Sequence, residues 1–198
     1  MPEAIKAKLI EKEYLKNDIL RFKVEANKIV ETAKPGNFIE IRVTDTTEPF
    51  LRRPISIYNL EKTEGTLEFI FQIKGEGTRL LSKKQEGDLI DIVGPLGMGT
   101  FKLNNYKNIA IIGGGIGVFP LYELSKEANK ENRNVNIYLG FRNKENVLLE
   151  GEFQNVSKKL VVTTDDGTYG IKGFAIEELK KDLSNIDCIY ACRTTSYA

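Results

Sequence analysis

The chain has 198 residues, of which 41% are apolar, and its 29 Lys and Arg balance 28 Asp and Glu to a formal charge of +1. This near-neutral balance gives no overall field that would attract nucleic acid or an anionic membrane. With no His and only two Cys, the sequence excludes His-dependent triads and a closed four-ligand site made of Cys and His. The sequence has no apolar run near the roughly 20 residues of a membrane helix and no signal-peptide h-region at its start, so we expect a cytoplasmic protein.

The first hundred residues have the pattern of an all-β unit. Apolar residues alternate with polar ones, as in Leu20, Phe22 and Val24, which is the pattern of strands with one buried face. We predict six strands, at residues 5–10, 20–24, 39–43, 54–60, 67–73 and 88–93. One short helix is predicted at residues 78–84. Many short strands with little helix predict a small antiparallel barrel or sandwich over residues 1–100.

The pattern changes after a boundary near residues 98–106. The run Ile109-Ala110-Ile111-Ile112 is continuously apolar, as expected for a parallel strand covered on both faces. Strands at residues 109–112, 135–139, 160–164 and 186–191 alternate with helices at 118–129, 149–158 and about 176–183. Alternating strands and helices with short connections predict a doubly wound parallel sheet over residues 101–198.

A glycine-rich run follows the first of these parallel strands. It consists of Gly113, Gly114, Gly115, Ile116 and Gly117. Glycines between a strand and a helix let the backbone approach a diphosphate, so the run predicts dinucleotide binding, with a purely structural tight turn as the alternative. Pro120 is acceptable in the first helical turn. Arg142 stands near the end of the next strand and is interpreted as a contact to a 2′-phosphate or adenine or as a solvated arginine, so the choice between NADH and NADPH stays open.

The β unit has two candidate phosphate-binding segments of its own. Arg52-Arg53-Pro54-Ile55-Ser56 places guanidinium groups and a hydroxyl on one strand, which suits a diphosphate. The alternative is a charged edge strand in which proline opposes aggregation. The segment Lys74-Gly75-Glu76-Gly77-Thr78 offers backbone N–H groups and a hydroxyl to another phosphate.

Together, these segments resemble the ferredoxin-reductase-like flavoproteins, and within them the electron-transfer subunits of class B dihydroorotate dehydrogenase. The signatures occur in the family's order over nearly the whole chain: Arg53-Pro54-Ile55-Ser56, Gly77-Thr78, Gly94-Pro95-Leu96-Gly97, residues 113–117 with Pro120-Leu121, and Thr164-Asp165-Asp166-Gly167. The resemblance implies an FAD-binding barrel of six strands followed by an NAD(P)-binding domain.

The resemblance also implies residue roles. By position, Arg53, Pro54, Ile55 and Ser56 would hold the FAD phosphates and ribityl chain, Ile70, Phe71 and Gln72 would line the flavin, and Gly77 and Thr78 would cap the diphosphate. The nicotinamide nucleotide would bind at residues 113–117 with Arg142 and Asp165, and Cys192 would face the flavin. The implied activity is hydride exchange between NAD(P)H and FAD in pyrimidine biosynthesis. Electrons would pass through a [2Fe–2S] cluster to an FMN-containing catalytic subunit, in a heterotetramer.

The sequence departs from the family's pattern at its end. The family continues after the cysteine with Gly-Pro-x-Pro-Met, a helix and a tail with four cluster-binding Cys, whereas here Cys192 precedes Arg193-Thr194-Thr195-Ser196-Tyr197-Ala198. We therefore expect a C-terminally shortened chain without cluster ligands, whose parallel-sheet domain is incomplete, and we interpret Cys188 as a buried core thiol. Two alternatives stay open: an electron-transfer subunit of a hydrogenase, sulfide dehydrogenase or ferredoxin:NADP oxidoreductase complex, or a non-catalytic flavin- or nucleotide-binding fragment.

Overall fold

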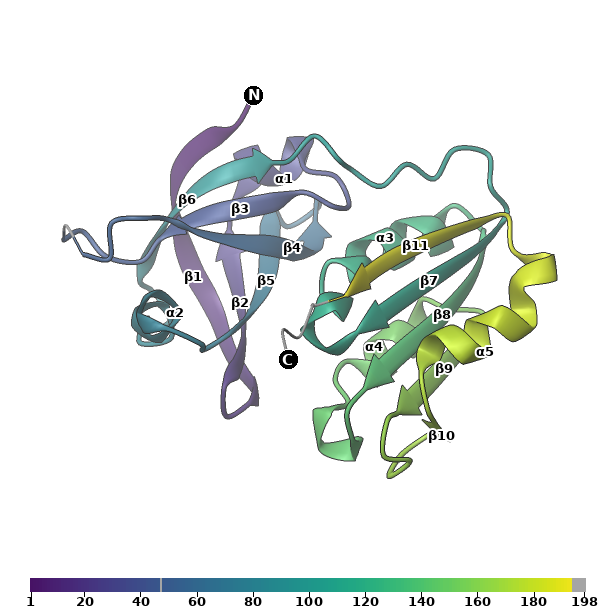
Figure 1. The fold of residues 1–198 in the computed structure, drawn as a ribbon. Helices are drawn as coiled ribbons and strands as arrows, with labels where there is room; N and C mark the ends of the chain where they lie inside the picture. The colour runs from purple at the N-terminus through teal and green to yellow at the C-terminus, as the bar shows by residue number, and fades with distance from the viewer. Residues whose placement is uncertain (47, 194–198) are drawn as a thin grey trace. The chain divides into compact units, whose positions relative to one another are not determined.

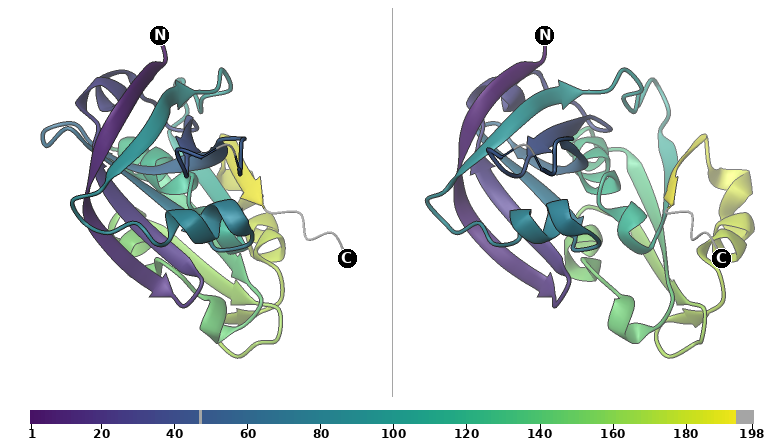
Figure 2. Two further views of the ribbon diagram at one scale, coloured as in Figure 1. Left: turned by 90° about the vertical axis from the view of Figure 1, so that its left-hand side faces the viewer. Right: turned by 60° about the vertical axis from the view of Figure 1, so that its left-hand side comes forward.

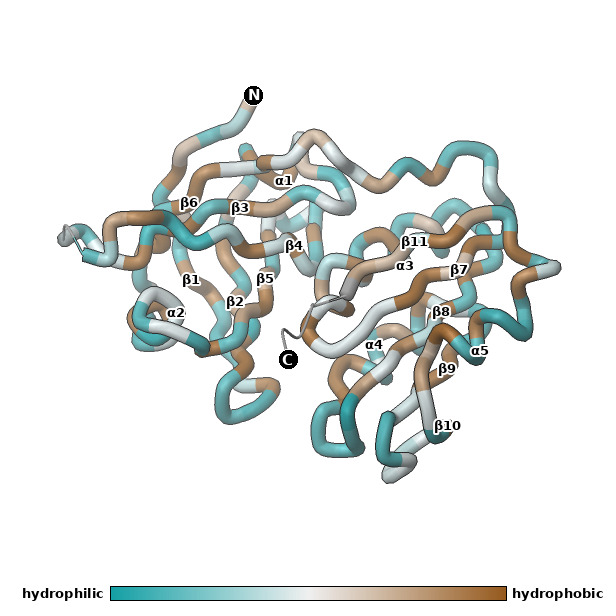
Figure 3. The backbone as a smooth tube through the Cα atoms, in the orientation of Figure 1, coloured by the Kyte–Doolittle hydropathy of each residue, from teal (hydrophilic) through white to brown (hydrophobic). Residues whose placement is uncertain are grey.

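The structure of the chain is a computed structural model that describes residues 1–46 and 48–193. The chain divides into two compact units, Met1–Thr100 and Phe101–Ala198 (Figure 1). Hydrophobic residues concentrate on the strands of both units, and the turns between them are mostly hydrophilic (Figure 3). Within the described residues, no helix is long and apolar enough to cross a membrane.

The first unit is a closed antiparallel barrel. Its six strands are β1 (Glu3–Lys16), β2 (Ile19–Glu25), β3 (Phe38–Arg42), β4 (Arg53–Glu61), β5 (Thr66–Gln72) and β6 (Leu89–Leu96). They follow the order β1-β2-β5-β4-β3-β6, and β1 pairs with β6 to close the wall, along which these two strands run side by side in each view of Figure 2. Closure leaves no open sheet edge. The predicted six-stranded barrel is confirmed.

Alternation along the strands fills the barrel with apolar side chains. Phe22, Phe69 and Phe71 are buried there, and Phe22 meets Phe71 edge to face with ring centroids 5.1 Å apart. Two short helices close off the same core, α1 (Asn27–Thr32) through Ile29 and α2 (Glu76–Leu81) through Leu81. The sequence predicted α2 two residues late and did not predict α1, because a six-residue helix shows too little periodicity to be recognised.

The second unit is a five-stranded sheet between two layers of helices. The strands β7 (Asn108–Gly114), β8 (Asn134–Phe141), β9 (Lys159–Thr164), β10 (Ile171–Lys172) and β11 (Cys188–Arg193) follow the order β10-β9-β8-β7-β11, and all pairs are parallel. The helices are α3 (Leu121–Lys130) and α4 (Glu150–Asn155) on one face and α5 (Ala175–Asp182) on the other (Figure 1). This arrangement confirms the predicted doubly wound parallel sheet.

Successive residues of β7 pack on opposite faces of this sheet. Ala110 packs with Tyr138 of β8 and with Leu179 of α5 in one buried cluster. Ile109 and Ile111 are fully buried as well and, by the alternation of the strand, point to the opposite face. A strand covered on both sides has no polar position, and this is why residues 109–112 form a continuous apolar run.

Candidate functional site

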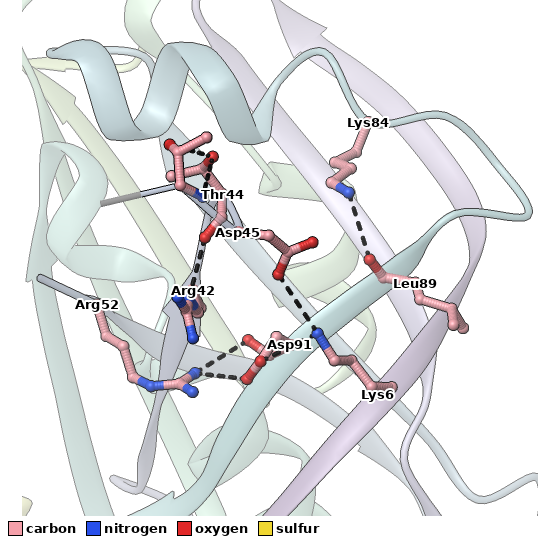
Figure 4. A network of polar contacts seen from close by, with 9 residues as sticks. Lys6, Arg42, Thr44, Asp45, Arg52, Lys84, Leu89 and Asp91 are labelled. Atoms are coloured by element: carbon pink, nitrogen blue, oxygen red, sulfur yellow. Dashed lines mark hydrogen bonds and ion pairs between the residues drawn. The ribbon is translucent and has the colours of Figure 1, made fainter. Parts of the chain in front are cut away.

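Arg52 and Arg53 are adjacent in sequence and have different partners. The Arg52 guanidinium is held by Asp91 of β6, with 2.7 Å between Nη1 and Oδ1, and Lys6 Nζ lies 3.1 Å from the other carboxylate oxygen (Figure 4). Burial alone would raise the pKa of Asp91, but the hydrogen bonds from Arg52 and Lys6 outweigh burial, so this pKa lies below its usual range. Arg52 is therefore engaged in the barrel wall and is not free for a ligand.

Arg53 extends to the start of α2 instead. A Cβ placed on Gly77 would lie 2.2 Å from Arg53 Nε and 2.7 Å from Cζ, so the guanidinium occupies the space that any other residue at position 77 would fill. Arg53 Nη1 donates to the Leu51 carbonyl. This contact uses one of the five N–H donors of the arginine, and the flat group is left over a glycine surface. The structure thus joins two segments that the sequence offered as separate phosphate sites.

The Thr78 hydroxyl is hydrogen-bonded within the loop that precedes α2. It accepts hydrogen bonds from the backbone N–H groups of Lys74 (3.0 Å) and Gly75 (3.2 Å) and donates to the Gly75 carbonyl (3.1 Å). Because the hydroxyl hydrogen is already used, Thr78 shapes the loop before α2 and does not offer that hydrogen to a phosphate in this geometry. Gly77 is buried beneath Arg53, and Thr78 is half-buried.

The strand positions predicted to line a flavin divide between the two faces of the barrel wall. Phe71 is a core residue, so within the strand predicted to line the flavin it presents its backbone, and not its side chain, to the outer face. Alternation places Ile70 and Gln72 on the outer face. On β4, Ile55 packs against the core, whereas Pro54 and Ser56 alternate with it and lie outward.

The glycine-rich run of the second unit lies at the end of β7. Gly113 and Gly114 belong to the strand, a 3₁₀ turn covers Gly115–Val118, and the α-helix α3 begins only at Leu121, three residues later than the predicted start at 118. A Cβ on Gly113 would lie 2.9 Å from side-chain atoms of both Val118 and Leu121, so glycine is needed for close packing. Gly115 has a φ of +55°, a conformation that favours glycine, while Ile116 is half-buried and Gly117 is buried in the same turn.

Parallel pairing gathers the other predicted nucleotide-binding residues at one edge of the sheet. Arg142 directly follows β8 and is exposed, and Asp165 directly follows β9. The Asp165 N–H donates to the Phe141 carbonyl at 3.0 Å, which ties the two strand ends together. Cys192 of β11 pairs with Gly113 of β7 in the sheet register. The carboxyl ends of the strands, where open α/β sheets bind ligands, therefore carry the glycine run, Arg142, Asp165 and Cys192 together.

The two cysteines are both free and half-buried. Burial raises the pKa of the Cys192 thiol, so it is neutral near pH 7. Cys188 was predicted to be a buried core thiol, but it is half-buried and lies beside Tyr190. Burial first, and then hydrogen bonding with Cys188, raises the pKa of Tyr190 to about 12. The departure from the family's pattern after Cys192 falls mostly on residues 194–198, which lie outside the described residues. Among residues 1–46 and 48–193, no group of three or more His, Cys, Asp or Glu could hold a metal ion.

The roles of two acidic residues in the barrel, Asp91 and Asp18, could not be predicted from the sequence. Asp91 binds Arg52 and leaves the neighbouring Arg53 to reach α2, and Asp18 accepts a hydrogen bond from Gln72 Nε2 at 2.6 Å. Asp91 is separated from its arginine by 39 residues and Asp18 from its glutamine by 54. Both contacts depend on strand order and register in the closed barrel, for which the sequence has no local signal.

Comparison with known proteins agrees with this architecture. The family model for the oxidoreductase FAD-binding domain matches residues 6–101. A solved structure of an NADH-dependent reduced ferredoxin-NADP oxidoreductase is 30% identical with a TM-score of 0.83, over 96% of this chain and 68% of that one. A cytochrome P450 reductase from Amycolatopsis, 20% identical over 96% of this chain and 61% of that one, shares the fold with a TM-score of 0.77. The barrel and the parallel sheet define a ferredoxin-reductase-like oxidoreductase.

Curated relatives narrow the family further. The electron transfer subunit of dihydroorotate dehydrogenase B (NAD(+)) from Fusobacterium nucleatum is 40% identical over 83% of this chain and 64% of its own length. The corresponding subunit from Bacillus mycoides is 35% identical over 92% of this chain and 70% of its own length. The chain belongs to the family of dihydroorotate dehydrogenase B electron transfer subunits. It spans a little under two thirds of the length of several of these relatives.

Proposed function

We propose that the first unit binds FAD, that the second binds NAD(H), and that the chain exchanges electrons between them on behalf of a catalytic dehydrogenase subunit. The observation that carries this proposal is the placement of the Arg53 guanidinium over Gly77. This planar group has several N–H donors without a hydrogen-bond partner among the described residues, and it lies beside a bare backbone surface. Such a group is suited to a diphosphate, since arginine binds two phosphate oxygens at once.

The residues of the β unit fit FAD. Arg53 and Gly77 would hold the diphosphate, with the Ser56 hydroxyl as a further donor on the outward side of β4. Ile70 and Gln72 on the outer face of β5 would lie against the ring system, where the isoleucine supplies apolar contact and the glutamine a polar one. Pro54 fixes the backbone between the arginine and the hydroxyl.

The second unit fits the diphosphate of NAD(H). Gly115 and Gly117 would allow close approach at the end of β7, and Arg142 and Asp165 would contact the adenosine part at the neighbouring strand ends. Because the curated relatives are named for NAD(+), we propose NAD(H) as the nucleotide. Cys192, paired with Gly113, would present a neutral thiol on the nicotinamide side.

When bound, FAD would supply the two-electron chemistry, accepting or giving a hydride at the nicotinamide. The chain's own contribution is to bind and orient the two cofactors, which needs no acid–base side chain and agrees with a sequence that has no His. We propose that the partner is the FMN-containing catalytic subunit of a dihydroorotate dehydrogenase in the cytoplasm, reached through a [2Fe–2S] cluster. No ligand of that cluster is assigned to the described residues.

The test is the visible absorption spectrum of the purified protein, before and after anaerobic addition of NADH. A flavin band that bleaches with NADH supports both cofactor sites and hydride exchange between them. A flavin band that NADH leaves unchanged would reduce the proposal to a flavin-binding fragment without turnover. A colourless protein that also fails to take up added FAD would overturn the proposal.

A second function is favoured by the similarity to the NADH-dependent reduced ferredoxin-NADP oxidoreductase, which at 30% identity is a relative in sequence as well as fold. In that case the partner is a ferredoxin-linked oxidoreductase subunit. The two functions are separated by adding a class B catalytic dihydroorotate dehydrogenase subunit to the reduced protein. Oxidation of the flavin in the presence of orotate supports the dihydroorotate dehydrogenase partner, and flavin that is oxidised only by ferredoxin supports the second function.

A further inference from the structure

Two hydrogen bonds join the turn between β1 and β2 to the end of β5. The Gln72 carboxamide donates from Nε2 to Asp18 Oδ2 at 2.6 Å, and the backbone N–H of Ile73 donates to the Asp18 carbonyl at 2.7 Å. Gln72 is also the register partner of Ile19 in the β2–β5 pair. Backbone pairing and the Ile73 contact hold the strand, so the side-chain bond to Asp18 is not needed to keep β5 in place.

The Asp18 carboxylate determines which way the Gln72 carboxamide points. A carboxamide has a donor end and an acceptor end of nearly equal shape, and its orientation follows from its hydrogen-bond partners. A carboxylate only accepts, so it binds the Nε2 end of Gln72 and excludes the Oε1 end. The acceptor Oε1 is therefore the end of Gln72 turned away from Asp18.

This acceptor lies on the wall that faces outward from the core. Phe69 and Phe71 point into the barrel, which places Gln72 on the outer face of β5. Ile57 is the register partner of Phe69, so Ser56 and Ile70 are neighbours on this outer face. Gln72 thus continues the row of residues that would lie along a bound flavin.

We propose that Asp18 is a positioning residue for flavin binding: it holds Gln72 so that Oε1 accepts a hydrogen bond from N3–H, the one ring N–H of the oxidised isoalloxazine. This inference rests on the proposed FAD site of the first unit. Without Asp18, the carboxamide turns freely and presents its donor or its acceptor to the ring. Fixing the acceptor in advance reduces the entropy lost on binding.

The experiment measures the dissociation constants of FAD and of FAD methylated at N3, using the full chain. Replacing Gln72 by Leu is expected to weaken FAD binding about 5-fold, the value of one hydrogen bond. Asp18→Ala is expected to weaken it about 3-fold. Asp18→Asn presents a donor as well as an acceptor and no longer excludes Oε1, so it is expected to weaken FAD binding about as much as Asp18→Ala does. Asn17→Ala, an exposed change in the same turn, is the matched control.

Two comparisons decide the outcome. Asp18→Ala in the Gln72→Leu background should have no further effect on FAD affinity, and N3 methylation should weaken binding to the original chain but not to Gln72→Leu. If Asp18→Ala lowers FAD affinity by the same factor in both backgrounds, Asp18 only supports the turn and the proposal is wrong. If Asp18→Ala does not fold, Asp18→Asn in the original and the Gln72→Leu backgrounds makes the same comparison, and an equal effect in both backgrounds overturns the proposal. An original chain that binds no FAD at all would overturn the proposed function itself.

Discussion

The guanidinium of Arg53 lies where the side chain of residue 77 would be, with Nε 2.2 Å from the position of a Cβ on Gly77. The two residues are 24 positions apart, and each belongs to a segment that resembles a phosphate-binding motif. Their contact makes the glycine a requirement of the arginine's position and makes the two segments a single site. Arg52, one position earlier, is held by Asp91 and takes no part in it.

Replacing Arg53 by Ala should reduce FAD binding, whereas replacing Arg52 by Ala should reduce the stability of the barrel. Arg53→Ala is expected to weaken FAD binding about 100-fold, because a charge-assisted partner of a phosphate contributes a few kcal/mol. Arg52→Ala should leave FAD affinity within a few-fold and lower the thermal midpoint instead, because it removes the ion pair with Asp91 and leaves Lys6 as the remaining close partner of that carboxylate. Flavin retention through gel filtration and a thermal melt measure the two effects. Equal flavin retention by Arg53→Ala and the original chain would contradict the diphosphate assignment.

A methyl group at position 77 should weaken FAD binding by displacing the Arg53 side chain. Gly77→Ala is expected to displace the guanidinium and weaken FAD binding at least 10-fold, since the contact is with the arginine side chain. Gly75→Ala is the matched control, because a Cβ there meets nothing within 4 Å. In an Arg53→Ala background the additional effect of Gly77→Ala should disappear. If it persists there, the glycine serves the backbone of α2 and not the arginine.

The glycine run of the second unit can be tested at Gly115. Gly115→Val introduces a β-branched side chain at a φ of +55° and is expected to abolish NADH binding while FAD binding to the first unit remains. NADH titration monitored by fluorescence, with the FAD content determined in parallel, measures this. Gly151→Ala in α4, where a Cβ meets nothing within 4 Å, should change neither. Loss of both cofactors together would show that the second unit's glycine affects folding of the whole chain.

Acid should weaken the barrel partly through Asp91. Its pKa in the folded chain lies below the value of about 3.9 for an unfolded Asp, so its contribution to stability is present above pH 4 and is lost as the pH falls through the folded pKa. Asp91→Asn should therefore lower the free energy of unfolding at pH 7 and flatten its decline below about pH 5. Urea unfolding at a series of pH values measures both. Asp45→Asn, at a side chain that is 91% exposed, should leave the curve unchanged.

Patterns among neighbouring residues in the sequence were sufficient to predict the strands and which of their faces are buried. Alternation along β5 indicated a strand with one buried face, and the continuous apolar run of β7 indicated a covered parallel strand. The alternation also places Phe71 with Phe69 in the core, so Ile70 and Gln72 are the residues of the predicted flavin-lining strand whose side chains lie on the outer face. Side-chain direction in a strand follows from a two-residue period, which the sequence shows directly.

Tertiary structure alone decided which residues share a site. Nothing in Arg52-Arg53 distinguishes the two guanidinium groups; Asp91 does, through the pairing of β3 with β6 that brings its strand within reach. The orientation of Gln72 depends in the same way on Asp18, which the closed barrel places beside it. Hydrogen bonds and ion pairs act over about 3 Å, whereas the residues they join here are tens of positions apart, so only strand order and register determine which partners meet.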